Sequence, residues 1–216
     1  MKKTMKNNVK LSFGEEIGNT VSHGATGLIF LFLLPFVSVY SYIKGGIPLA
    51  IGTSIYVICI ILMLLTSCIY HSMPFDTKHK YVTRILDHSM IFLAIAGSYT
   101  PILIYIVKGP LGYGTLIFLW ICVVLGILYK AIAQNADSKI TLVFYLSMGW
   151  TAIILIPDLI SKTSPLFLSL IVLGGLFYTV GTYFYSKKDK PYFHFIWHLF
   201  IIAAVFSHFV AIVFFM

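Results

Sequence analysis

Long apolar runs constrain this chain more than any other feature. The hydrocarbon core of a bilayer is about 30 Å thick, so a helix that crosses it needs about 20 mostly apolar residues. Charged, Gly and Pro clusters divide the sequence into seven such runs: 18–42, 49–72, 85–107, 111–130, 140–160, 165–186 and 192–216. A chain of 216 residues then has no room for a separate soluble domain. The sequence predicts an all-α membrane protein whose seven transmembrane helices form one bundle.

Composition and patterning argue against other classes of protein. Hydrophobic residues make up 59% of the chain and charged residues only 10%, which is far from the balance of a soluble domain. A β-barrel needs strands with alternating polarity, whereas the stretch from Ile51 to Leu65 is almost continuously apolar. The net charge of +8 comes from small clusters between the runs rather than a basic stripe. Nucleic acid is therefore not an expected partner.

The basic residues alternate between the two sides of the predicted bundle. The N-terminal side receives twelve: Lys2, Lys3, Lys6, Lys10, Lys78, Lys80, Arg84, Lys130, Lys139, Lys187, Lys188 and Lys190. The opposite side receives three, Lys44, Lys108 and Lys162. By the positive-inside rule the N-terminus is cytoplasmic and the C-terminus lies outside. The expected organisation is a cytoplasmic segment, 1–17, followed by the seven-helix domain, 18–216.

Ionisable side chains inside the runs carry most of the functional information, because such groups are costly in a membrane and usually face the interior of a bundle. A spacing of four residues places Ser67 and His71 on one helix face near the end of the second run. The same spacing joins His194 and His198 at the start of the seventh run. Asp87 opens the third run. The topology predicts that these groups lie at similar depth near the cytoplasmic face.

Three imidazoles with an open fourth position are typical of a catalytic zinc site, in which the metal activates a water molecule. His71, His194 and His198 are the predicted zinc ligands, and Asp87 is placed to hydrogen-bond the water. The alternative interpretation is that each histidine is an interfacial residue hydrogen-bonded to backbone. Convergence of three imidazoles at one depth favours the metal site.

The remaining polar residues give weaker indications. His23 lies near the same face of the membrane, as a packing residue or a neighbour of the site, and His88 points about 100° away from Asp87. His208 is about 21 Å along the helix from His194, too far to share a metal. A surface role near the membrane is expected for Glu15 and Glu16.

Taken together, several of these residues resemble the bacterial haemolysin III proteins. The resemblance spans nearly the whole chain and rests on Glu15-Glu16, Asn19, Ser22-His23-Gly24, Ser67-x3-His71, Asp87-His88, the segment 96–101 (Ala-Gly-Ser-Tyr-Thr-Pro) and His194-x3-His198. That family is similar to the progestin and adiponectin receptors and, more distantly, to alkaline ceramidases. All are seven-helix proteins with a cytoplasmic N-terminus.

The resemblance implies zinc ligands at His71, His194 and His198, an acidic residue near the zinc at Asp87, and a serine one turn before the first ligand at Ser67. It implies a multi-pass protein of the bacterial plasma membrane that hydrolyses a lipid amide or ester, with membrane lipid as substrate or ligand. Two alternatives stay open. One is a zinc-stabilised receptor or lipid-homeostasis protein without turnover, and the other is a cytolytic pore, suggested only by the family's name.

Overall fold

A computed structural model describes residues 9–133, 139–187 and 189–216, and within these ranges the chain is helical with no strand. Lys2, Lys3, Lys6 and Lys188, which contributed to the predicted charge asymmetry, lie outside the described residues. Nine helical elements follow one another along this part of the chain: α1 (Phe13–Ser72), α2 (Lys78–Pro101), η1 (Ile102–Val107), α3 (Gly109–Ala133), α4 (Lys139–Trp150), α5 (Ala152–Lys162), α6 (Pro165–Ser186), α7 (Phe193–Val210) and η2 (Ala211–Phe215). The two η elements are π-helical.

Six stretches of the described chain are long and apolar enough to cross a bilayer, where the sequence predicted seven. The difference lies in α1, whose 60 residues contain both the first and the second predicted runs. The stretches are Phe13–Ser72, Lys78–Val107, Gly109–Ile132, Ile140–Lys162, Pro165–Ser186 and Phe193–Phe215. The helical character of the protein and its membrane-crossing potential are thus confirmed, while the count differs by one.

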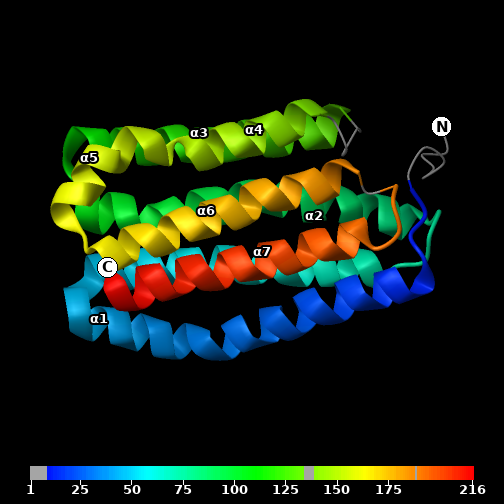
Figure 1. The fold of residues 1–216 in the computed structure, drawn as a ribbon, viewed down its shortest axis with the longest axis horizontal. Helices are drawn as coiled ribbons and strands as arrows, with labels where there is room; N and C mark the ends of the chain where they lie inside the picture. Colours follow the sequence, from blue (N-terminus) through cyan, green and yellow to red (C-terminus); the bar gives the residue numbers. More distant parts are fainter. Residues whose placement is uncertain (1–8, 134–138, 188) are drawn as a thin grey trace.

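The backbone of α1 is broken near its middle. Gly45 has φ −145° and ψ 16°, and Gly46 has φ 68° and ψ −162°, a conformation that only glycine adopts without strain. Figure 1 shows α1 reversing direction, with its second part running back beside the first. The Lys44 ammonium donates to the carbonyl of Phe214 at 2.9 Å, which ties this reversal to the end of the chain. A straight helix of this length would measure about 90 Å, three times the hydrocarbon thickness.

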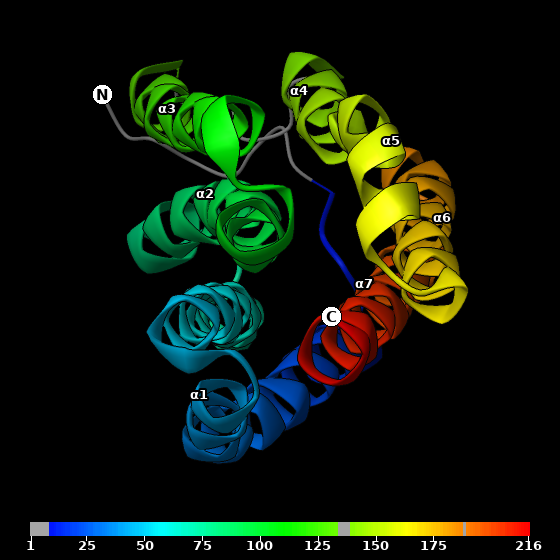
Figure 2. The same ribbon diagram turned by 90° about the vertical axis from the view of Figure 1, so that its left-hand side faces the viewer.

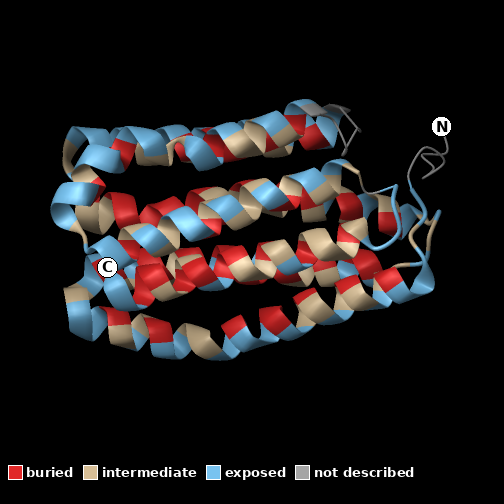
Figure 3. Ribbon diagram, viewed as in Figure 1, coloured by how far each residue is buried: buried red, intermediate tan, exposed pale blue. Residues whose placement is uncertain are grey.

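The helices form a ring when the bundle is viewed end-on (Figure 2). Packing follows the order α1, α2, α3, α4, and then α6, α7 and α1 again, so the last helix closes the ring against the first. The start of α1 and the end of η2 lie at opposite ends of the bundle (Figure 1). Figure 3 shows many buried residues along α7 and along the first part of α1.

A hydrogen-bonded junction joins the beginnings of α1 and α7. The hydroxyl of Ser12 accepts from the backbone N–H of Glu15, and the Glu15 carboxylate accepts from the backbone N–H of Ser12, which forms a capping box. The second carboxylate oxygen of Glu15 accepts from the N–H of Tyr192 at 2.6 Å. Tyr192 has φ 62° and immediately precedes α7. This junction fixes the register of α7 two residues before His194.

Candidate metal centre

Three buried histidines from α1 and α7 meet near the end of the bundle where α1 begins. His71 lies in the last turn of α1, and His194 and His198 lie in the first two turns of α7. The Nε2 atom of His194 is 3.3 Å from Nε2 of His71 and 3.2 Å from Nε2 of His198. All three potential ligand atoms lie within 4.8 Å of one another, so the group could hold a metal ion. The predicted convergence of these three imidazoles is confirmed.

The half-buried carboxylate of Glu16 contacts the ring of His71 and is itself paired with a buried lysine. Oε2 of Glu16 is 2.6 Å from Nδ1 of His71, and Oε1 of Glu16 accepts from Nζ of Lys80 at 2.5 Å. Lys80 is 1% exposed and also lies over the ring of Tyr70, 4.7 Å from its centroid. When Nδ1–H of His71 donates to Glu16, the lone pair on Nε2 faces the other two histidines. A carboxylate that orients a histidine in this way is a common partner of metal ligands.

The expected surface role of Glu15 and Glu16 is therefore wrong. Glu15 is buried in the helix-start junction, and Glu16 contacts His71. A signal in the sequence could have found the second contact, because Glu16, Asn19 and His23 have the spacing i, i+3, i+7 and lie on one face of a helix. Asn19 is fully buried, with its Nδ2 3.4 Å from Nδ1 of His71.

The other residues predicted for the site line one cavity of about 240 Å³ that also receives His194 and His198. Ser67 and Asp87 both line it, from α1 and α2. Ser67 is buried, whereas the side chain of Asp87 is 14% exposed. The structure thus places the predicted serine and carboxylate beside the same space as two of the histidines. Their chemical roles stay predictions.

His88 faces this cavity too, although the sequence left its direction open. Its Nδ1 is 2.9 Å from the carbonyl oxygen of Arg84 and 3.6 Å from a carboxylate oxygen of Asp87. Its Nε2 is 3.1 Å from the hydroxyl of Tyr185. His88 therefore joins α2 to α6 at the cavity wall and does not belong to the group of three potential ligands.

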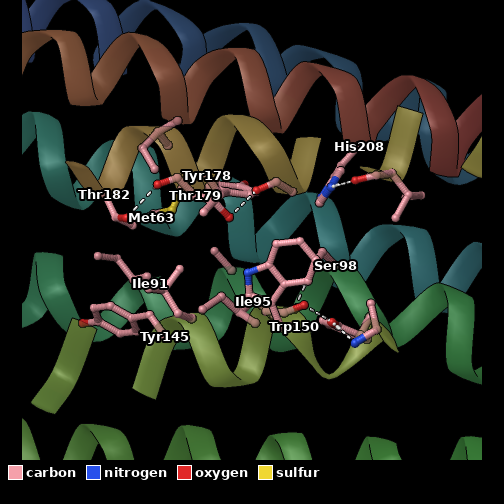
Figure 4. A pocket seen from close by; sticks show the side chains of 18 of the residues that line it. Met63, Ile91, Ile95, Ser98, Tyr145, Trp150, Tyr178, Thr179, Thr182 and His208 are labelled. Atoms are coloured by element: carbon pink, nitrogen blue, oxygen red, sulfur yellow. Dashed lines mark hydrogen bonds between the residues drawn. The ribbon is translucent and has the colours of Figure 1, made fainter. Parts of the chain in front are cut away.

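Away from the histidines, the cavity is enclosed mostly by apolar side chains from α2, α4, α5, α6 and α7. Figure 4 shows Ile91 and Ile95 of α2 opposite Tyr178, Thr179 and Thr182 of α6. His208 lines its far part and contacts the carbonyl oxygen of Ile171 through Nε2 at 3.1 Å. His208 is not among the potential ligands, in agreement with the predicted separation. The cavity therefore joins a polar end at the histidines to a long apolar interior.

The fold and the site define a multi-pass helical membrane protein with a buried histidine triad and an adjoining apolar cavity. The chain belongs to the haemolysin III family: a family model described as "Haemolysin-III related" matches residues 11–209. The predicted family is thus confirmed.

Individual relatives agree with this assignment. The chain is 34% identical to a "Hemolysin-3 homolog" of Bacillus subtilis (strain 168), over 93% of this chain and 94% of the relative. It is 32% identical to "Hemolysin-3" of Bacillus cereus, over 93% of this chain and 91% of the relative. A human protein, "Monocyte to macrophage differentiation factor", is 28% identical over 69% of this chain and 64% of its own length.

Proposed function

We propose that this protein is a zinc-dependent hydrolase of lipid amides or esters in the bacterial plasma membrane. The observation that carries the proposal is the spacing of the three Nε2 atoms beside a cavity lined by Asp87 and Ser67. Tetrahedral zinc with Zn–N distances of about 2.0–2.1 Å needs ligand nitrogens about 3.3–3.4 Å apart. The two observed separations, 3.3 and 3.2 Å, fit that requirement.

The donor set favours zinc over harder cations. Three neutral imidazole nitrogens suit zinc, whereas calcium and magnesium prefer oxygen ligands. Glu16 supports the same assignment, because its carboxylate fixes the tautomer of His71 with Nε2 free to bind a metal. Zinc held by three imidazoles would supply Lewis-acid activation of a carbonyl group and of water.

Side chains of the protein would transfer the proton, position the reacting groups and bind the lipid. Asp87 would accept a proton from the attacking water and hold it in place, and the hydroxyl of Ser67 would help to position the reacting group. The apolar length of the cavity would bind an acyl chain and keep its carbonyl at the histidine end. Burial of this end would limit the access of bulk water to the site.

We further infer that the chain crosses the membrane seven times, with its N-terminus in the cytoplasm. Reversal of α1 at Gly45 and Gly46 supports two crossings within this one element. The opposite placement of the start of α1 and the end of η2 supports an odd number of crossings. A reporter fused after Met216 should be modified by a membrane-impermeant reagent in intact cells. Modification only after lysis would contradict the orientation.

Metal analysis and a turnover assay test the enzymatic proposal. Purified protein should contain nearly one zinc per chain, and alanine at His71, His194 and His198 together should remove it. Asp87→Asn should keep the zinc and lower lipid hydrolysis by about 100-fold or more, because it removes a general base. Zinc absent from the wild-type protein would refute the site. Hydrolysis unchanged in Asp87→Asn would refute the assigned role.

A structural zinc is a second candidate, because the triad joins α1 to α7, the first and last helices. Such a zinc would lend thermal stability without turnover. The two candidates differ in the hydrolysis assay. The structural site predicts that zinc removal lowers the unfolding temperature and that the zinc-loaded protein hydrolyses no lipid amide or ester.

A further inference from the structure

Two polar side chains meet in the far part of the cavity, away from the histidine triad. His208 of α7 and Tyr178 of α6 both line it (Figure 4), and their ring centroids are 5.6 Å apart with an interplanar angle of 65°. The wall around them includes the apolar side chains of Leu168, Val172 and Ile212. Polar groups in such surroundings are costly unless they are paired. The pair therefore indicates either a structural contact or a polar partner within the cavity.

One edge of the His208 ring is fixed against α6. Its Nε2 lies 3.1 Å from the carbonyl oxygen of Ile171, so this nitrogen carries the proton and donates. A Cβ atom at Gly174 would lie 2.2 Å from Cδ2 of His208, so the glycine makes room for the ring against α6. In the neutral imidazole, Nδ1 is then left as an acceptor. This nitrogen makes no hydrogen bond within the described residues, and the protein does not fully enclose it.

The hydroxyl of Tyr178 is in the same situation. It makes no hydrogen bond to the described part of the chain and is not fully enclosed. The buried hydroxyl of Tyr56, by contrast, donates to the carbonyl of Val205 at 3.2 Å. A structural contact between α7 and α6 explains the position of Nε2 of His208. It explains neither the free acceptor Nδ1 nor the free hydroxyl of Tyr178.

We propose that Nδ1 of His208 and the hydroxyl of Tyr178 together bind a hydroxyl group carried far along the chain of a lipid in the cavity. An alcohol can donate to Nδ1 and accept from Tyr178 at the same time, so one hydroxyl pairs both groups. A methylene group can do neither. The proposal rests on the proposed function, because it requires an acyl chain in the cavity, and it names a chain with a distal hydroxyl as the preferred class.

The depth of the pair determines where that hydroxyl lies on the chain. His208 follows His198 by ten residues and His194 by fourteen, which is about 15 and 21 Å along a helix that rises 1.5 Å per residue. An extended hydrocarbon chain with carbon–carbon bonds of about 1.5 Å advances about 1.25 Å per carbon. A chain whose carbonyl carbon lies at the triad therefore reaches His208 with about its twelfth to seventeenth carbon.

Binding of fatty acids to the full-length, zinc-loaded protein tests this pairing, because an acid is the acyl product of the proposed reaction and binds without turnover. The probes are hexadecanoate, 16-hydroxyhexadecanoate and 3-hydroxyhexadecanoate, titrated calorimetrically in one detergent. Tyr178→Phe removes only the hydroxyl. His208→Gln keeps an N–H for the carbonyl of Ile171 but removes the acceptor Nδ1. Tyr183→Phe, at an exposed position of α6 outside the cavity, is the matched control.

The measured quantity is the affinity of each hydroxy acid divided by that of hexadecanoate, a ratio in which partition into the micelle cancels between variants. For 16-hydroxyhexadecanoate, Tyr178→Phe and His208→Gln should each lower this ratio about fivefold, as expected for one lost hydrogen bond. The ratio for 3-hydroxyhexadecanoate should not change, because its hydroxyl lies near the triad. Tyr183→Phe should change neither ratio. Tyr178→Phe should keep the zinc content and unfolding temperature of the wild type, since its hydroxyl pairs with no described residue.

Three results would overturn the proposal: no binding of any acid, a ratio for 16-hydroxyhexadecanoate that is unchanged in Tyr178→Phe or His208→Gln, or an equal change in both ratios. An unchanged ratio would indicate that water pairs the two groups whatever chain is bound, and equal changes would indicate a packing effect. Failure of the proposed function is distinguishable, because it would appear as hydroxyl selection by this pair in a protein that hydrolyses no lipid amide or ester.

Discussion

The helices of this bundle fall into two groups that differ in how much of their surface the protein covers. Within an 18-residue apolar segment of α1, of the α2 stretch and of the α7 stretch, 56%, 56% and 50% of the residues are buried inside the protein. The corresponding values are 28% for α3 and 17% for both the α4–α5 stretch and α6. The three predicted metal ligands, Glu16 and Asp87 all lie on the well-covered group. The less covered helices, α3 to α6, form the lipid-facing group, and α4, α5 and α6 also supply cavity wall.

The difference between the groups follows from how helices associate in lipid. Burial of apolar side chains gives little gain there, so close association depends on small residues and on polar contacts. Both are present on α1 and α2: Gly52 faces the backbone of Pro101, and Glu16 joins His71 to Lys80. The covered group is thus a rigid support that can hold three imidazoles at fixed separations. Three predictions test this contrast, beginning with the largest effect.

Neutralising Glu16 should weaken the metal site more than removing a comparable charge from the lipid-facing group. Glu16→Gln keeps an oxygen near Nδ1 of His71 but removes the negative charge that orients and polarises the ring. Loss of such a partner typically lowers metal affinity about 10- to 100-fold. The affinity is measured by competition with a chromophoric zinc chelator in detergent.

Asp158→Asn is the matched control, because Asp158 pairs with Lys162 on α5, in the lipid-facing group. Its zinc affinity should equal that of the wild type. Equal zinc affinities for Glu16→Gln and the wild type would show that the contact between Glu16 and His71 has no influence on the metal.

A single added methyl group should distinguish the two groups by stability. A Cβ atom at Gly52 would lie 2.7 Å from the backbone Cα of Pro101, which cannot move without shifting α2. Overpacking of this kind costs about 1–3 kcal/mol. Gly52→Ala should therefore lower the unfolding temperature in detergent, measured by intrinsic fluorescence.

Gly114→Ala is the companion variant in α3, where the added Cβ meets no atom within 4 Å. Because alanine has a higher helix propensity than glycine by about 1 kcal/mol, this variant should be as stable as the wild type or more so. Similar losses in both variants would contradict the proposed difference in packing.

The sequence predicted the class of fold and the convergence of His71, His194 and His198 because both depend on strong local signals. Apolar runs of bilayer length identified the helices, and the His194-x3-His198 spacing placed two imidazoles on one face. His71 joined them through topology, which the alternation of lysines supplied. The count of spanning helices differed because the two predicted runs lie on either side of the break at Gly45 and Gly46 and together form the single element α1.

The contact between Glu16 and His71 was missed for a different reason. Its two residues are 55 positions apart, and the pairing depends on how the two parts of α1 fold against each other. Charge near a helix start is usually solvated, so the local pattern favoured the surface. The cavity could not be predicted for the same reason, because its walls come from helices that are distant in the sequence.

The smallest expected effect concerns a link between the two groups. The hydroxyl of Tyr99, on α2, accepts from the backbone N–H of Ala152 at 2.8 Å and donates to the carbonyl of Gly149, bridging the break between α4 and α5. Tyr99→Phe leaves these two backbone groups without that partner and should cost about 1 kcal/mol, or about 2–4 °C in unfolding temperature. Tyr113→Phe, at a half-exposed position, should cost nothing measurable.

Because Gly149 and Ala152 line the cavity, Tyr99→Phe should also weaken binding of a dodecanoyl lipid. Unchanged stability and unchanged binding would show that the two groups of helices hold together without this bridge.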